Sequence, residues 1–175
     1  MNIRVRRTAA VLTAAVALGA GTAAWAASPA SAAPAATPAC TAGNLAVWVN
    51  ADSASGAAGT INYDLKFTNI GGYTCHLTGY PGVSATNFSG DQLGAPARRV
   101  NNAPARIVNI PPDGTAHSNL GYIEVQVDPS CRPVRADLLR VFPPNAKGAR
   151  HAFFDLTVCT TGRVDLTIDR VQPGV

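Results

Sequence analysis

The sequence predicts an all-β domain, an immunoglobulin-like antiparallel β-sandwich with two disulfide bonds. Several short segments after residue 40 alternate apolar with polar side chains, and clusters of Gly, Pro and Asn separate them. No window after residue 32 shows sustained helical periodicity. Short alternating segments with turn residues between them are typical of the half-buried strands of a sandwich. A partly open barrel built from the same strands is the alternative.

Residues 1–32 are predicted to be a secretory signal peptide. Arginines lie near the start, an uncharged Ala-rich run follows over residues 8–25, and small residues come next. A basic, then an apolar, then a small-residue region is the pattern of an export signal. No lasting membrane anchor is expected, because the run is weakly hydrophobic and no charged stop-transfer segment follows it. The cleavage sites that fit are Ala30-Ser31-Ala32, which we favour, and Ala24-Trp25-Ala26.

Most of the net positive charge belongs to this predicted signal. Of 14 basic side chains in the full sequence, three are Arg4, Arg6 and Arg7. Without them, 11 basic residues face 10 acidic ones, a formal excess of +1. A balance so close to zero predicts no nucleic-acid partner. Residues 33–39 are then expected to form a flexible Ala/Pro leader, and residues 40–175 a single β-sandwich domain.

The first half of the domain begins with two clear strand patterns. Residues 45–50 and 60–68 alternate, the second with Ile, Tyr, Leu and Phe on one face and Asn, Asp, Lys and Thr on the other. Asn and Gly residues at 69–72 predict a turn, and a short strand is expected at 75–77. Residues 79–104 are irregular, with short strands expected around Val83 and at 98–100.

The second half continues in the same way. A strand at 106–110 leads into Pro111-Pro112-Asp113-Gly114, which predicts a turn. A long strand should follow, in which Gly121 suggests a bulge. Thr160-Thr161-Gly162 predicts a tight hairpin between the last two strands. The strands expected here span residues 115–127, 137–142, 152–159 and 163–170.

Four cysteines in an exported chain predict two disulfide bonds. Three pairings are possible, and we expect Cys40–Cys75 and Cys131–Cys159. Cys40 precedes the first predicted strand and Cys75 follows the second, so antiparallel pairing brings them together. Cys131 and Cys159 flank a predicted hairpin in the same way. Zinc is not expected, because the sequence has no Cys-x-x-Cys pair.

The sequence shows no constellation of catalytic residues. It has no Gly-x-Ser-x-Gly motif, phosphate-binding glycine loop or calcium loop. Three histidines, at 76, 117 and 151, are expected to be solvated polar residues. The acidic residues, including Asp64, Asp155, Asp165 and Asp169, mostly fall on the outward phase of strands, which favours a solvated face. We therefore expect a protein that is not an enzyme and that uses no cofactor or metal.

A binding surface is expected in the irregular segment 79–104. Its candidate residues are Tyr80, Phe88, Arg98 and Arg99, because loops on a rigid scaffold commonly carry binding residues. Trp48 is expected to cover the edge of the core, or else to join a binding surface. The partner would be an extracellular protein or a glycan, met in the medium or at the cell wall.

Several motifs along residues 40–171 are similar to those of a known family. Its most specific stretch here is Phe67-Thr68-Asn69, followed by Cys75-His76-Leu77-Thr78-Gly79-Tyr80-Pro81-Gly82. With Ile110-Pro111-Pro112-Asp113-Gly114 and Leu139-Arg140-Val141-Phe142-Pro143-Pro144, the chain resembles the domain of unknown function 4232 family. The resemblance implies an all-β extracytoplasmic domain with two disulfides and brings no catalytic residues. Family members often carry Gly at the position of Asp113.

The sequence therefore favours a secreted, non-enzymatic binding or cell-envelope module. A secreted protease inhibitor is the alternative, with Pro129-Ser130-Cys131-Arg132-Pro133 as its reactive loop. The proline after Arg132 argues against recognition of that loop by cleavage. A hydrolase ranks last, because no catalytic constellation supports it.

Overall fold

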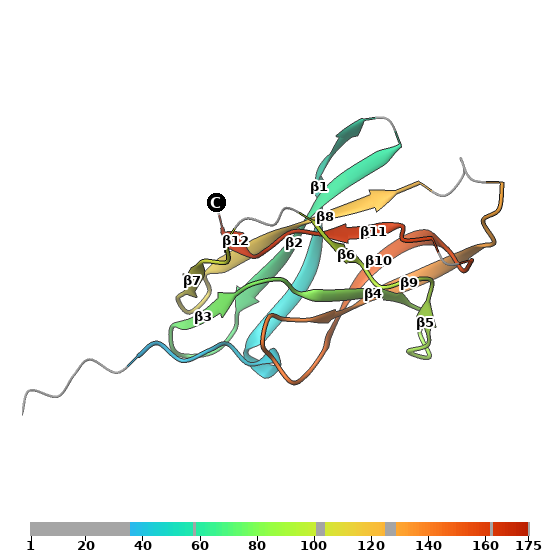
Figure 1. Cartoon of the computed structure of the whole chain (residues 1–175). Coiled ribbons are helices and arrows are strands. Elements are labelled where there is room, and N and C mark those ends of the chain that lie inside the picture. The colour runs from blue at the N-terminus through green and yellow to red at the C-terminus, as the bar shows by residue number, and fades with distance from the viewer. Residues whose placement is uncertain (1–35, 58, 101–103, 125–128, 162, 175) are drawn as a thin grey trace, which may run out of the picture. The chain divides into compact units, whose positions relative to one another are not determined.

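Two sheets hold most of the described chain (Figure 1). The computed structural model describes residues 36–57, 59–100, 104–124, 129–161 and 163–174, all within the compact unit Ala35–Val175. The predicted signal peptide lies outside the described residues. No helix among the described residues has the length and apolar character needed to span a membrane.

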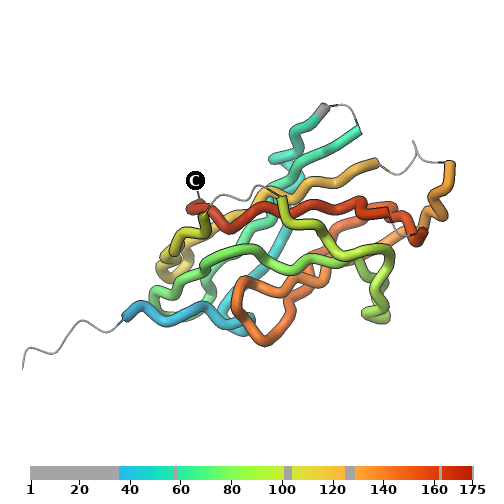
Figure 2. The backbone as a smooth tube through the Cα atoms, viewed as in Figure 1, coloured from blue at the N-terminus to red at the C-terminus, as the bar shows by residue number. Residues whose placement is uncertain are grey.

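The larger sheet has six strands, and its edge strand β1 is the longest. The chain's last segments return alongside β8, as the tube view makes visible (Figure 2). All pairs in this sheet are antiparallel except β11 with β6, which is parallel. In spatial order the strands are β1 (Leu45–Ala57), β2 (Thr60–Asn69), β8 (Thr115–Ile123), β11 (Leu166–Ile168) and β6 (Arg98–Arg99), with β12 (Gln172–Pro173) also on β8.

The second sheet has four antiparallel strands, and a small two-stranded sheet accompanies it. The second sheet runs β10 (Arg150–Cys159), β9 (Pro133–Phe142), β4 (Gly82–Thr86) and β5 (Gln92–Leu93). The small sheet pairs β3 (Cys75–Thr78) with β7 (Ile107–Ile110). One 3-10 turn, η1 (Ala42–Asn44), precedes β1.

Side chains from both main sheets meet in one buried cluster. On β2 the predicted alternation is confirmed, because Leu65 and Phe67 are fully buried. Tyr63 on β2 meets Phe154 on β10 edge to face, with ring centroids 4.9 Å apart. Further members are Leu45, Leu120, Leu139, Val141, Leu156, Val158, Leu166 and Ile168. The all-β class is confirmed, and two sheets around one core are consistent with an immunoglobulin-like sandwich.

Both predicted disulfides are confirmed. Cys40–Cys75 joins Cα atoms 4.9 Å apart, and Cys131–Cys159 joins Cα atoms 5.3 Å apart. The pairing of β1 with β2 brings the first two cysteines together, and the β9–β10 hairpin does the same for the second two. Both hairpins follow from the antiparallel pairing expected of adjacent alternating segments.

The predicted hairpin between residues 152–159 and 163–170 is wrong. β10 belongs to the four-stranded sheet, whereas β11 pairs with β8 and β6 in the six-stranded sheet. Asp165 lies where the chain crosses between the sheets: its carboxylate accepts a hydrogen bond from the Cys159 N–H, and its carbonyl accepts one from the Ile123 N–H. The crossing also explains why Asp165 and Asp169 are buried rather than solvated as predicted.

The predicted bulge at Gly121 is also wrong. β2 and β8 stay in register across this position, with Gly121 opposite Asn62. A Cβ atom added there would lie only 2.3 Å from the Thr167 hydroxyl oxygen on β11. The glycine therefore makes room for a neighbouring side chain and does not mark a break in the pairing.

Candidate binding surface

The structure separates the four residues predicted to form a binding surface. Arg98 and Arg99 make up β6, at the edge of the six-stranded sheet. The Arg99 guanidinium carbon lies 5.7 Å from the centre of the Tyr80 ring, which is within the range of a cation–π contact. Phe88 lies elsewhere, at the tip of the turn between β4 and β5.

Phe88 lines an aromatic cavity of about 390 Å³. Phe88 and Phe153 in its wall are 71% and 81% exposed, whereas Phe154 packs against the core. Exposed phenylalanines gathered at one place are unusual, because each leaves a large apolar surface in water. The remaining lining residues are Val49, Ala51, Arg135, Asp137 and Asp155. We call this set the aromatic surface.

An irregularity in the β9–β10 pairing places the two adjacent phenylalanines. Phe153 lies opposite Leu138, but Leu156 lies opposite Ala136, so β10 has one extra residue between these pairs. An extra residue in one strand re-aims the side chains beside it. As a result Phe154 packs against the core and meets the partly buried Tyr63 ring, while Phe153 stays exposed.

The turn that carries Phe88 is braced by its own side chains. Asn87 accepts a hydrogen bond from the Asp91 N–H at 2.9 Å and donates one to the Asp91 carboxylate at 3.0 Å. The Gly90 N–H donates to the Asn87 carbonyl at 3.1 Å, and Gly90 has a φ of 87°. Only glycine adopts such a φ without strain. The turn therefore holds Phe88 in a defined, exposed position.

Two of the three charged residues of the aromatic surface, Arg135 and Asp155, form an ion pair, and Asp137 is the third. The Arg135 guanidinium donates two hydrogen bonds to the Asp155 carboxylate, one of them at 2.8 Å between Nε and Oδ1. Both side chains remain more than half exposed. A two-pronged pair fixes both side chains but adds no net charge beside the phenylalanines. Sequence reasoning missed Phe153, Arg135 and Asp155, although the adjacent pair Phe153-Phe154 breaks the alternation and could have signalled the bulge.

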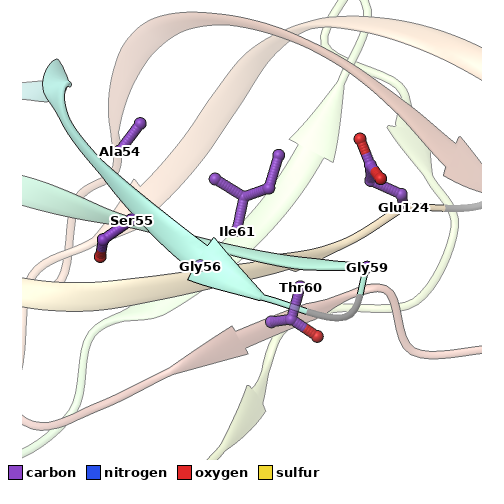
Figure 3. Close-up of a pocket in the computed structure, with 7 residues that line it drawn as sticks. All are labelled: Ala54, Ser55, Gly56, Gly59, Thr60, Ile61 and Glu124. Atoms are coloured by element: carbon purple, nitrogen blue, oxygen red, sulfur yellow. The ribbon is translucent and has the colours of Figure 1, made fainter.

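A second hollow of about 250 Å³ lies at the tip of the β1–β2 hairpin (Figure 3). Ile61 and Glu124 extend to one side of the strand there, whereas Ser55 and Thr60 extend to the other. Most of its wall consists of small residues, and Glu124 is the one charged group among the described lining residues. This hollow offers a ligand less apolar contact than the aromatic surface.

The three histidines lie on different strands. His76 lies on β3, and its Nδ1 is 2.9 Å from the Thr37 carbonyl. His117 lies on β8, and the exposed His151 lies on β10, opposite Arg140 on β9. These strands belong to three different sheets. Within the described residues, no group of three His, Cys, Asp or Glu side chains is placed to hold a metal ion.

Hydrogen bonds hold residues 129–133, the segment considered as an inhibitor loop, against residues 160 and 161. The Arg132 carbonyl accepts hydrogen bonds from both the N–H and the hydroxyl of Thr160, each at 3.1 Å. The Ser130 carbonyl accepts one from the Thr161 hydroxyl at 3.0 Å. Pro133 already begins β9, opposite Cys159. The peptide bond that a protease would address is thus next to a paired strand.

Comparison with known proteins gives one result. No curated protein matches the chain, and no solved structure matches it. The model of the family described as Domain of unknown function (DUF4232) matches residues 40–173, most of the chain and nearly all of the described residues. The chain therefore belongs to the domain of unknown function 4232 family.

Proposed function

We propose that this chain is a secreted, non-enzymatic binding module, and that the aromatic surface engages an extracellular protein. The observation that carries the proposal is the exposure of Phe88 and Phe153 at 71% and 81% in the wall of one cavity. Two disulfides and no free cysteine among the described residues suit an oxidising, extracytoplasmic location.

A protein partner suits the chemistry of this surface. Protein interfaces are enriched in aromatic residues and arginine at their centres and have polar rims. Here Phe88 and Phe153 supply apolar anchors, and the neighbouring Arg135–Asp155 pair and Asp137 supply a polar rim. A cavity of about 390 Å³ could receive a side chain from the partner.

The alternatives have less support. An inhibitor needs an exposed reactive loop, whereas the Arg132 carbonyl is held by two hydrogen bonds from Thr160. A hydrolase needs converging acid, base and nucleophile, whereas among the described residues no hydrogen bond joins His76, His117 or His151 to a carboxylate or a hydroxyl group. We therefore rank the binding module first.

Crosslinking on intact cells tests the proposal. The full chain is expressed with Phe88→Ala, Phe153→Ala or both, and its crosslinked partners are identified by mass spectrometry. Each single change should lower the yield of one protein partner by about tenfold, because loss of an interface anchor costs more than about 1 kcal/mol. The melting temperature should stay unchanged, because both side chains are exposed.

Ile107→Ala provides the matched control. Ile107 is 67% exposed but belongs to β7 in the small sheet. It should leave the crosslinked partner unchanged. The proposal would be rejected if no protein crosslinks, if the phenylalanine variants retain the partner, or if Ile107→Ala reduces it equally.

A further inference from the structure

The outer face of the six-stranded sheet is polar and includes an exposed tryptophan. Trp48 on β1, Lys66 on β2 and His117 on β8 are cross-strand neighbours in one row. Their neighbours Leu65, Phe67 and Ala116 are buried in the core, so the row itself faces outward. Six residues make up what we call the polar face: Trp48, Asp64, Lys66, Thr68, His117 and Asn119.

Hydrogen bonds hold the Trp48 ring across the sheet. Its Nε1 donates to the Thr68 hydroxyl at 3.2 Å, and that hydroxyl lies 3.0 Å from the hydroxyl of Thr115 on β8. The side chain is 44% exposed. We expected Trp48 to cover the edge of the core. It instead presents a fixed apolar ring surface to solvent.

The charges on the polar face cancel. Lys66 is only 7% exposed, and its Nζ lies 3.1 Å from the Asp64 carboxylate. A lysine so poorly exposed needs such a partner, because an unpaired buried charge is costly. With His117 neutral, the six residues have no net formal charge. An anionic or cationic ligand would therefore find little complementary charge here.

Groups able to hydrogen-bond a ligand remain beside the ring. His117 is partly exposed, and its Nδ1 is buried without a partner, so Nε2 is the ring nitrogen that can meet a ligand. Asn119 is partly exposed in the next row, opposite Asp64. An imidazole nitrogen and an amide both donate and accept hydrogen bonds, depending on tautomer and orientation.

We infer that the polar face binds a neutral saccharide chain. One face of a pyranose ring is a set of C–H groups, which can pack on the Trp48 ring with favourable dispersion and loss of apolar surface. The hydroxyl groups at its rim match the mixed donors and acceptors of His117 and Asn119 and the acceptor oxygens of Asp64. This site lies on the outer face of the six-stranded sheet, whereas Phe153 lies on β10 of the four-stranded sheet and Phe88 on the turn between β4 and β5 of that sheet. The inference does not depend on the proposed function.

Tryptophan fluorescence can report on this site alone. The sequence has two tryptophans, Trp25 and Trp48, so the full chain with Trp25→Phe has Trp48 as its single tryptophan, whose emission can be excited selectively at long wavelength. The probes are soluble hexamers of β-1,4-linked glucose and of β-1,4-linked N-acetylglucosamine. At least one should shift the Trp48 emission in a saturable manner, because ring stacking removes water from the indole.

Affinity electrophoresis supplies the second readout. The wild-type chain should be retarded in native gels that contain hydroxyethyl cellulose or glucomannan. Trp48→Ala should weaken this association by about tenfold or more, and Asn119→Ala by several-fold. Phe153→Ala is the matched control: it removes an exposed aromatic side chain from the other sheet and should leave the retardation unchanged.

Several results would overturn the inference. These are no emission shift and no retardation with any of the four probes, retardation of Trp48→Ala equal to that of the wild type, or retardation only by dextran sulfate. The last result would indicate an anion-binding surface instead. If Trp48→Ala lowers the melting temperature, the emission titration of the Trp25→Phe chain decides whether Trp48 contacts the saccharide. Absence of saccharide binding by the wild-type chain, together with retained protein crosslinking, would reject this inference alone.

Discussion

Asp165 shows how one residue can look exposed in the sequence and still be buried. It occupies a polar position between Val164 and Leu166, as a solvent-facing strand residue would. In the structure it is 2% exposed, accepts a hydrogen bond from the Cys159 N–H, and lies 3.1 Å from Arg163 Nε. Alternation predicts the two faces of a strand, but Asp165 precedes β11, in the segment that crosses from one sheet to the other, and local alternation does not reveal such a crossing.

Asp165→Asn should destabilise the protein by about 2 kcal/mol, because it weakens a buried charge-assisted hydrogen bond and the ion pair with Arg163. Urea unfolding followed by circular dichroism measures the change. Asp155→Asn is the control, since Asp155 pairs with Arg135 in the open and should cost less than about 1 kcal/mol. Equal costs for the two variants would contradict this account of Asp165.

Tyr122 links the two sheets and makes stability depend on pH. Its hydroxyl donates a hydrogen bond to the Thr157 carbonyl on β10 at 2.8 Å. Burial raises the pKa of Tyr122 above its ordinary value of 10.0, with smaller contributions in the same direction from nearby acidic groups. The unfolded chain therefore loses this proton at lower pH than the folded one, and the stabilisation declines as pH rises above 10.

We expect the free energy of unfolding to fall as pH rises from 10 through the raised pKa of Tyr122. Tyr122→Phe should cost about 1 kcal/mol near neutrality, because it removes the bond to Thr157, but should show a shallower decline above pH 10. Urea unfolding at a series of pH values compares the two proteins. Parallel curves through this range would show that Tyr122 does not contribute.

At the scale of elements, the family motif at the end of β2 has a structural role. Asn69 is fully buried, and its amide donates to the Tyr73 and Ile110 carbonyls, each at 2.9 Å. Its side-chain oxygen accepts the Gly71 N–H at the same distance. One side chain thus closes its own turn and joins it to β7. The motif stabilises the fold and identifies no reactive group.

The predicted turn before β8 is present and includes a strained residue. Asp113 has a φ of 61°, and its N–H donates to the Asn69 carbonyl. The left-handed conformation suits Gly and tolerates Asp, but strongly disfavours branched residues. Asp113→Val should therefore lower stability by about 1–2 kcal/mol, whereas Asp113→Gly should change it by less than about 1 kcal/mol. Thermal unfolding measures both, and equal effects would argue against backbone strain.

At the scale of the whole molecule, we expect the chain to be exported, to lose its signal peptide and to form both disulfides. The predicted signal lies outside the described residues, so cleavage stays a prediction. Edman sequencing of the protein from culture medium should begin at Ala33, and a non-reducing peptide map should contain Cys40–Cys75 and Cys131–Cys159. By loop entropy, removing either bridge should cost roughly 3–4 kcal/mol. A retained signal, or a Cys75–Cys131 peptide, would contradict this expectation.

The sequence by itself determined the all-β class, the main strands and both disulfides. These depend on local alternation, turn residues and hairpins between adjacent segments, which neighbouring residues along the chain specify. It could not determine that β11 joins β8 instead of β10, because an alternating strand satisfies its apolar face equally well in either sheet. Nor could it show that Phe88 and Phe153 line one cavity, or that Trp48, Lys66 and His117 form one row. Only the tertiary structure decided these, because pairing between distant strands brings such residues together.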